Sequence, residues 1–117
     1  MNWKRIENTD DLNEAIEKSH NTPIVIFKHS TRCSISAAAL DRLERSWDHA
    51  EIKELPYFLD LIRFRNVSNE IVSELGVEHE SPQIIVVKDG KSIYDSSHFS
   101  ISYEEVRKAT TVESVDL

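Results

Sequence analysis

The most reactive side chain in this sequence belongs to its single cysteine, Cys33. A thiolate attacks disulfides readily and a neutral thiol attacks them poorly, so the chemistry of a lone cysteine depends on what favours the thiolate. Arg32 precedes Cys33 directly, and Lys28 and His29 lie a few residues upstream, which supplies positive charge. These residue types indicate a nucleophile for thiol–disulfide exchange. The alternative is an inert buried thiol, which is common for free cysteine.

The elements around Cys33 are expected to place it at the start of a helix. Residues 24–27 form a continuous β-branched and aromatic run, which is typical of a strand buried on both faces. Residues 29–32 form a short polar connection, and from Cys33 to Trp47 apolar residues recur at helical spacing among Ala, Leu, Glu and Arg. The first turn of a helix carries unpaired N–H groups and the positive end of the helix dipole, which stabilise a thiolate.

Helices and strands alternate along the rest of the chain. Apolar, β-branched and aromatic runs predict strands at 3–6, 57–62, 83–88 and 91–96, with a hairpin turn at Asp89-Gly90. Helical spacing predicts helices at 10–18, 69–75 and 103–109. The resulting order of elements indicates an α/β fold, with helices on both faces of a mixed sheet.

Residues with capping preferences mark the ends of these helices. Asn8 or Thr9 is expected to cap the first helix, Ser68 the helix at 69–75 and Ser102 the last helix, and Gly76 is expected to end the third. No repeat or domain boundary is visible. We therefore expect a single domain over residues 1–117, with residues 110–117 as a loose tail.

Composition narrows the classes of function. The net charge of −7 argues against a general nucleic-acid-binding surface, because phosphate binding needs clustered Lys and Arg. The longest apolar run, residues 84–87, is far too short to span a membrane, and the polar start of the chain does not resemble a signal peptide. A lone thiol fits a reducing compartment best. We expect a cytoplasmic protein that binds neither membrane nor nucleic acid.

Two segments carry a family resemblance. Residues 27–36 read Phe-Lys-His-Ser-Thr-Arg-Cys-Ser-Ile-Ser, and residues 80–91 read Glu-Ser-Pro-Gln-Ile-Ile-Val-Val-Lys-Asp-Gly-Lys. With a cysteine at the strand-to-helix turn and a proline before the final hairpin, residues 3–109 resemble the thioredoxin fold and, within it, the monothiol bacilliredoxin family. The family pattern Cys-Pro-Ile-Ser is matched except at Ser34, which replaces the proline.

The resemblance implies a role for particular residues. Cys33 would be the nucleophile, and Ser36 lies where dithiol relatives carry the resolving cysteine. The Ser36 hydroxyl could donate a hydrogen bond to the Cys33 sulfur, cap backbone groups, or do both. Pro82 would be a cis-proline beside the nucleophile, with the backbone of Ser81 pairing with an extended substrate. The alternative for Pro82 is an ordinary trans proline that begins a strand.

The implied activity is removal of bacillithiol from S-bacillithiolated proteins by a monothiol mechanism. Bacillithiol, a low-molecular-weight thiol that carries a malate, would be the co-substrate, and no tightly bound cofactor is required. Arg32 and Lys28 are the candidates for binding its carboxylates.

Two other functions are alternatives to this one. A non-enzymatic adaptor or redox sensor, whose cysteine is only reversibly capped, is favoured by Ser34 in place of the proline. An iron–sulfur carrier ranks last, because the Cys-Gly-Phe-Ser pattern and later glycine pair of such proteins are absent. His29, His79 and His98 match no standard zinc spacing, so no metal site is predicted.

Overall fold

The central strands are built from the longest apolar runs of the chain. β2 (Ile24–His29) and β4 (Gln83–Lys88) pair antiparallel, and β3 (Tyr57–Asp60) lies parallel to β2 on its other side. The edges are β1 (Lys4–Arg5), parallel to β3, and β5 (Lys91–Ser97), antiparallel to β4. The sheet is therefore mixed, in the order β1-β3-β2-β4-β5.

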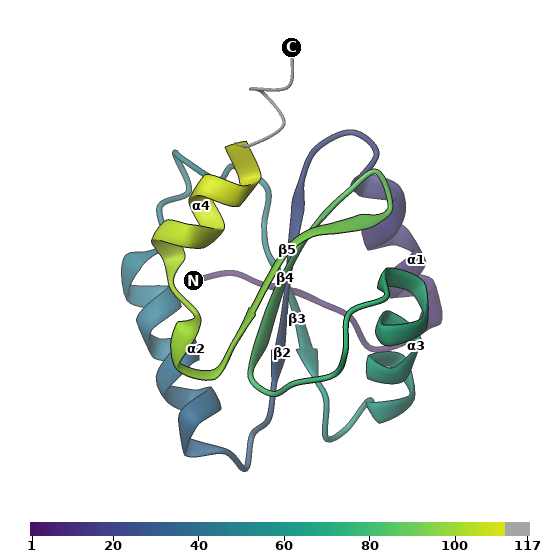
Figure 1. The fold of residues 1–117 in the computed structure, drawn as a ribbon, viewed down its shortest axis with the longest axis horizontal. Helices are drawn as coiled ribbons and strands as arrows, with labels where there is room; N and C mark the ends of the chain where they lie inside the picture. Colours follow the sequence, from purple (N-terminus) through teal and green to yellow (C-terminus); the bar gives the residue numbers. More distant parts are fainter. Residues whose placement is uncertain (112–117) are drawn as a thin grey trace.

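Helices cover both faces of this sheet, as Figure 1 shows for the computed structural model, which describes residues 1–111. α1 (Thr9–Lys18) and α3 (Arg65–Leu75) lie on one side. α2 (Ser34–Ser46) and α4 (Tyr103–Thr111) lie on the other, with the short 3-10 helix η1 (His98–Ser100) between β5 and α4. The predicted fold class is confirmed.

Alternation along the strands gives each face its own core. Ile26 belongs to the core under α1 and α3, where it joins side chains such as Leu12 and Ile71. Its neighbour Phe27 belongs to the core under α2 and α4, together with Leu43. Successive side chains of a strand point to opposite faces, so a strand buried on both sides must be apolar throughout, as residues 24–27 are.

β2 is longer than the sequence predicted. The predicted strand ends at Phe27, and His29 was expected in the polar connection. The strand instead continues through Lys28 and His29, because these residues pair in register with Leu59 and Asp60 of β3. Both side chains are buried, at 0% and 7% exposure. Backbone pairing with β3 therefore keeps these two polar residues in the strand, although their residue types favoured a loop.

The boundary between β3 and α3 was also predicted wrongly. β3 ends at Asp60, whose Oδ1 accepts the backbone N–H of Ile62 at 3.2 Å and turns the chain out of the sheet. α3 then begins at Arg65, so Ser68 is not its cap but a residue within it, 1% exposed. The position before the helix is occupied by Phe64, whose side chain makes no capping hydrogen bond.

The other predicted capping residues are confirmed. Asn8 caps α1 by accepting the N–H of Asp11 at 2.8 Å, Ser102 Oγ accepts the N–H of Glu105 at 3.3 Å, and Gly76 ends α3 at a φ of 66°. α4 extends to Thr111, past the predicted end at residue 109. Residues 112–117 of the predicted tail lie outside the described residues.

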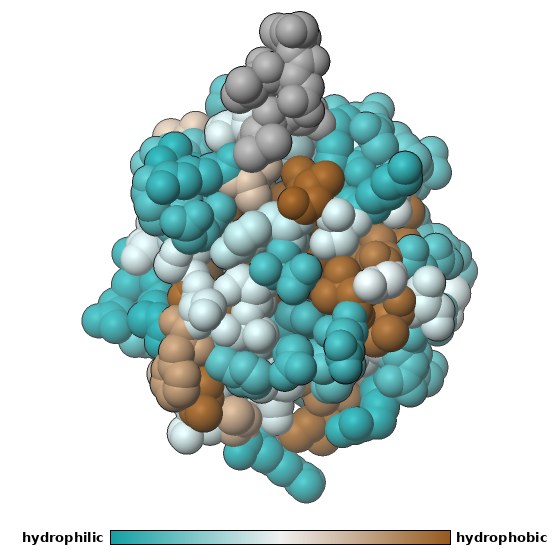
Figure 2. Space-filling view, in the orientation of Figure 1, coloured by the Kyte–Doolittle hydropathy of each residue, from teal (hydrophilic) through white to brown (hydrophobic). Residues whose placement is uncertain are grey.

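The visible surface is largely hydrophilic, with separate apolar patches (Figure 2). Among the described residues, the large apolar side chain with the greatest exposure is Phe99 of η1, at 78%. Within residues 1–111 no helix has the length and apolar character needed to cross a bilayer.

Candidate active site

Cys33 is the N-cap residue of α2, as the sequence predicted. Its backbone is extended, with φ −112°, and its carbonyl accepts the N–H of Ala37 at 3.0 Å, the first turn of the helix. Its own N–H donates to the carbonyl of Ser30 at 3.2 Å, which closes the connection from β2. Cys33 is a partly exposed residue, as the sequence predicted. No acidic residue lies in the first turn of α2, so nothing there opposes a negative charge on the sulfur.

Ser36 lies in the first turn of α2 and is completely buried. Its Oγ accepts the backbone N–H of Ser30 at 3.1 Å and is hydrogen-bonded to Nδ1 of His29 at 2.7 Å. The backbone-capping role weighed for this serine is therefore present. Among the hydrogen bonds of the described residues, none reaches the Cys33 sulfur.

Pro82 lies next to the carboxyl end of β2, the end that leads to Cys33. The Ser81–Pro82 bond is cis, which confirms that prediction, and the Pro82 carbonyl accepts the N–H of His98 at 3.0 Å. The register pairs Lys28 with Gln83, the residue after Pro82. Ser81 is partly exposed, and its buried Oγ has no partner within the described part of the chain. Direct contact between Pro82 and the sulfur stays a prediction.

The two cations expected to bind an anionic thiol differ in accessibility. Arg32 is exposed beside Cys33 and makes no ion pair with any carboxylate of the described residues. Lys28 is fully buried on the face opposite His29, with Nζ 3.4 Å from Nδ1 of His79. Burial lowers the pKa of Lys28 to about 8. In this conformation Lys28 does not present its ammonium group to a ligand at Cys33.

Replacing Lys28 by methionine is expected to stabilise the protein at neutral pH. The pKa of Lys28 is about 8 when folded and about 10.4 in an unfolded chain. Between about pH 8 and about pH 10.4 the unfolded chain keeps the proton on Lys28 and the folded protein loses it. The free-energy cost of burying the charged ammonium group is therefore fully present at about pH 7, and it decreases as the pH rises through this range. We expect Lys28→Met to gain on the order of 1 kcal/mol at pH 7 and to flatten the rise in stability between pH 8 and 10.

Urea unfolding at a series of pH values measures this effect. Lys91→Met is the matched control, since Lys91 is exposed on β5. A loss of stability at pH 7 with an unchanged pH slope would mean that the bond to His79 outweighs the desolvation of Lys28.

His29 is the site residue whose contact the sequence did not reveal. It was expected in a polar connection, yet it lies in β2 on the same face as Phe27, with ring centroids 5.9 Å apart, and 5.4 Å from the ring of Phe58. Burial lowers the pKa of His29, while the carboxylates of Asp60 and Glu44 act in the opposite direction. The alternation of faces after Phe27 was the one available signal that His29 would point toward α2.

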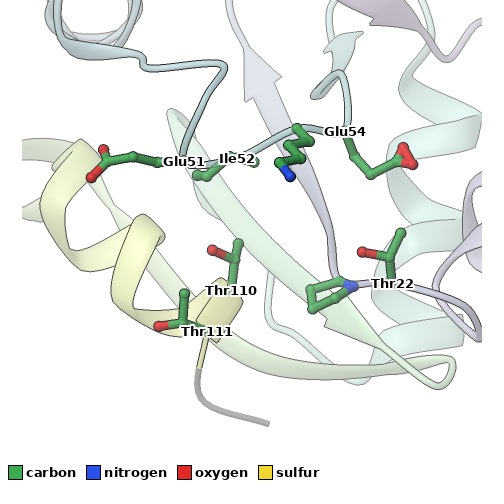
Figure 3. A pocket seen from close by; sticks show the side chains of 8 residues that line it. Thr22, Glu51, Ile52, Glu54, Thr110 and Thr111 are labelled. Atoms are coloured by element: carbon green, nitrogen blue, oxygen red, sulfur yellow. The ribbon is translucent and has the colours of Figure 1, made fainter. Parts of the chain in front are cut away.

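Two cavities on the described residues are lined by side chains that do not include Cys33 or its immediate neighbours. The cavity in Figure 3 is lined by residues that include Thr22, Glu51 and Thr110, at the amino end of β2. Six strand residues separate that end from the turn at Cys33, a span of about 20 Å. A second cavity lies beside β1 and Tyr57. No group of His, Cys, Asp and Glu side chains within residues 1–111 is arranged to hold a metal ion.

Solved structures share this fold. A candidate oxidoreductase with a thioredoxin fold is 27% identical, with a TM-score of 0.79 over 92% of each chain. A thioredoxin of Malassezia sympodialis is 17% identical, with a TM-score of 0.73 over 97% of this chain and 91% of its own. A thioredoxin of Fasciola hepatica is also 17% identical, with a TM-score of 0.71 over 94% and 98%. The two thioredoxins show likeness of fold alone.

A sequence profile narrows the relationship further. The profile described as monothiol bacilliredoxin BrxC matches residues 4–106, which include β2, the turn at Cys33, Ser36 and the cis-proline segment. This match and the thioredoxin fold support a thiol–disulfide redox function. With its lone thiol at the start of α2 and a serine at the resolving position, the chain belongs to the monothiol bacilliredoxin family.

Proposed function

We propose that this protein removes bacillithiol from S-bacillithiolated proteins, with Cys33 as the nucleophile. One observation carries the proposal. The only thiol of the chain is partly exposed at the N-cap of α2, and the resolving position holds the buried hydroxyl of Ser36. A hydroxyl cannot form a disulfide, so a mixed disulfide on Cys33 must be resolved by a thiol from solution.

The reaction then has two exchange steps. The Cys33 thiolate attacks the bacillithiol sulfur of the mixed disulfide, a new S–S bond forms to Cys33, and the substrate protein leaves as a thiolate. The thiolate of a free bacillithiol next attacks the capping sulfur, which releases bacillithiol disulfide and restores the Cys33 thiolate. Over the two steps, the mixed disulfide of the substrate protein is reduced to a thiol and free bacillithiol is oxidised to bacillithiol disulfide. Neither step uses a tightly bound cofactor.

The residues around Cys33 supply recognition in this proposal. Arg32 is exposed and has no carboxylate partner among the described side chains, so it is available to the malate carboxylates of bacillithiol. Ser81 would pair through its backbone with an extended segment of the substrate protein. Lys28 contributes positive charge from beneath the surface, and direct binding by its ammonium group would require the contact with His79 to open.

Intact mass after exposure to bacillithiol disulfide tests the proposal. We expect the wild type to gain one bacillithiol, Cys33→Ala to gain none, and free bacillithiol to remove the cap. Turnover with an S-bacillithiolated protein should be lost entirely in Cys33→Ala. A wild type that takes up no bacillithiol would contradict the proposal.

One departure from the family pattern favours a second function. Ser34 replaces the proline that usually follows the nucleophile, and it is exposed as the first residue of α2. The protein could then act as an adaptor or redox sensor whose cysteine is capped without turnover. Repeated turnover by the wild type in the same assay would exclude that function.

The proposed reaction needs a thiol-rich, reducing environment, since the cap is removed by free bacillithiol. A lone free thiol and the absence of any possible internal disulfide suit such a compartment. We therefore propose the cytoplasm as the location, and S-bacillithiolated proteins as the partners.

A further inference from the structure

His29 is a buried titratable group that the proposed exchange steps do not use. Its ring is stacked on Phe27 and tilted against Phe58, so its position is fixed by packing on the face that α2 covers. Asp60 of β3 pairs in register with His29, and Glu44 belongs to α2. Burial lowers the pKa of His29, and the negative charges of these two carboxylates act in the opposite direction. Neither carboxylate forms an ion pair with His29 among the described residues.

A chain of hydrogen bonds links His29 to the backbone of the nucleophile. Nδ1 of His29 is bonded to Ser36 Oγ at 2.7 Å, and the same oxygen accepts the N–H of Ser30 at 3.1 Å. The carbonyl of Ser30 in turn accepts the N–H of Cys33 at 3.2 Å. The connection between β2 and α2 is therefore held from inside by two buried side chains, and Cys33 is its last residue.

The hydroxyl of Ser36 has one proton to donate. Its oxygen already accepts from Ser30, so the bond to His29 decides where that proton points. When Nδ1 of His29 carries no hydrogen, the hydroxyl donates to it. When Nδ1 is protonated it becomes the donor, and the hydroxyl proton is released toward the first turn of α2, where Cys33 lies on the same helical face three residues earlier.

We propose that His29 is a positioning residue for Cys33, acting through Ser36 to hold the turn at residues 30–33 and to direct the Ser36 hydroxyl proton. The inference rests on the proposed role of Cys33 as nucleophile and adds a residue that touches neither substrate nor bacillithiol. His29 lies on the opposite face of β2 from Lys28, so the two buried groups act separately.

Two substitutions separate hydrogen bonding from packing. His29→Phe keeps an aromatic ring against Phe27 and Phe58 but cannot bond Ser36, whereas His29→Asn keeps a polar group near Nδ1 that does not titrate. The measurement is the second-order rate constant of Cys33 with an aromatic disulfide, dithiobis(nitrobenzoate), followed by absorbance. Because the chain has one cysteine, the whole signal comes from Cys33, and Cys33→Ala gives the blank.

We expect His29→Phe to react about tenfold more slowly than wild type at pH 7.5, and His29→Asn to restore the rate to within about threefold. Ser36→Ala should slow the reaction as much as His29→Phe, and the double variant no further, because both changes remove one chain of bonds. As the pH falls on the acid side of neutrality, the wild-type rate should fall less steeply than that of His29→Asn, since only the wild type can protonate Nδ1 of His29 and release the Ser36 hydroxyl proton.

The outcomes are distinguishable. Equal rates for wild type and His29→Phe, or identical pH profiles for wild type and His29→Asn, would overturn the role of His29 and leave the proposed function intact. A wild type that reacts with neither the aromatic disulfide nor bacillithiol disulfide would instead overturn the proposed function. Near-ultraviolet circular dichroism shows whether each variant is folded, and Ser36→Ala tests the chain of bonds even if His29→Phe does not fold.

Discussion

Replacing Ser36 by cysteine is expected to turn a stable bacillithiol cap on Cys33 into one that is lost without any outside thiol. Residues at i and i+3 lie on the same face of a helix, and Cys-x-x-Cys pairs in this position form disulfides. The new thiol would also lie where Ser36 Oγ now meets Nδ1 of His29 at 2.7 Å. An intramolecular thiol has a very high effective concentration, so it should expel bacillithiol and close a disulfide with Cys33.

The test is to cap each protein with bacillithiol, remove free thiol, and follow the intact mass with time. The wild type should keep its cap indefinitely, and Ser36→Cys should lose it with first-order kinetics at any protein concentration. Ser34→Cys is the matched control, because the neighbouring position faces away from Cys33 and is exposed. A cap that leaves the wild type spontaneously would refute the monothiol mechanism. A stable cap on Ser36→Cys would show that the two side chains do not meet.

Replacing Phe27 by alanine is expected to cause the largest loss of stability among the substitutions considered. Phe27 is 0% exposed, and its ring lies within 6.3 Å of the rings of Trp3, His29 and Phe58. Truncation of a buried aromatic side chain removes its transfer free energy and leaves a cavity, for a total of about 3–5 kcal/mol. That is a large share of the roughly 5–15 kcal/mol that stabilises a typical domain.

The free energy of unfolding in urea measures this loss. Ile93→Ala on β5 is the control, because Ile93 is 42% exposed, and surface changes are usually worth less than about 0.5 kcal/mol. We expect the midpoint of Phe27→Ala to fall sharply and that of Ile93→Ala to change little. A loss below about 1 kcal/mol for Phe27→Ala would mean that the core beneath α2 and α4 collapses to fill the space.

The sequence predicted the parts of the site that depend on local pattern. The apolar run at 24–27 and the composition change at Cys33 were enough to predict the strand, the turn and the helix start. The sequence also predicted helix ends correctly where the capping residue is adjacent to the helix that it ends, as Asn8 is to α1 and Gly76 is to α3. These features are encoded within a few residues, so no knowledge of tertiary contacts was needed.

The errors arose where a distant partner decides the structure. Lys28 and His29 are polar, and only pairing with β3 and β4 shows that they extend the strand and are buried. Ser68 resembles a cap but lies inside α3, and its contact with His79 at 3.5 Å joins residues from different elements. The bond between His29 and Ser36 likewise forms across the turn from β2 to α2. Alternation along the strand indicates the face on which His29 lies, but it does not identify Ser36 as the partner.

The sheet separates two hydrophobic cores, and this separation affects which substitutions the protein can accept. Phe27 and the bonded pair His29 and Ser36 lie in the layer under α2 and α4, whereas the layer under α1 and α3 shares only the strands with them. Substitutions that share no packing partners tend to have additive effects on stability. Substitutions that repack the layer under α1 and α3 can therefore change the heat tolerance of the protein while leaving the packing around the turn to Cys33 unchanged.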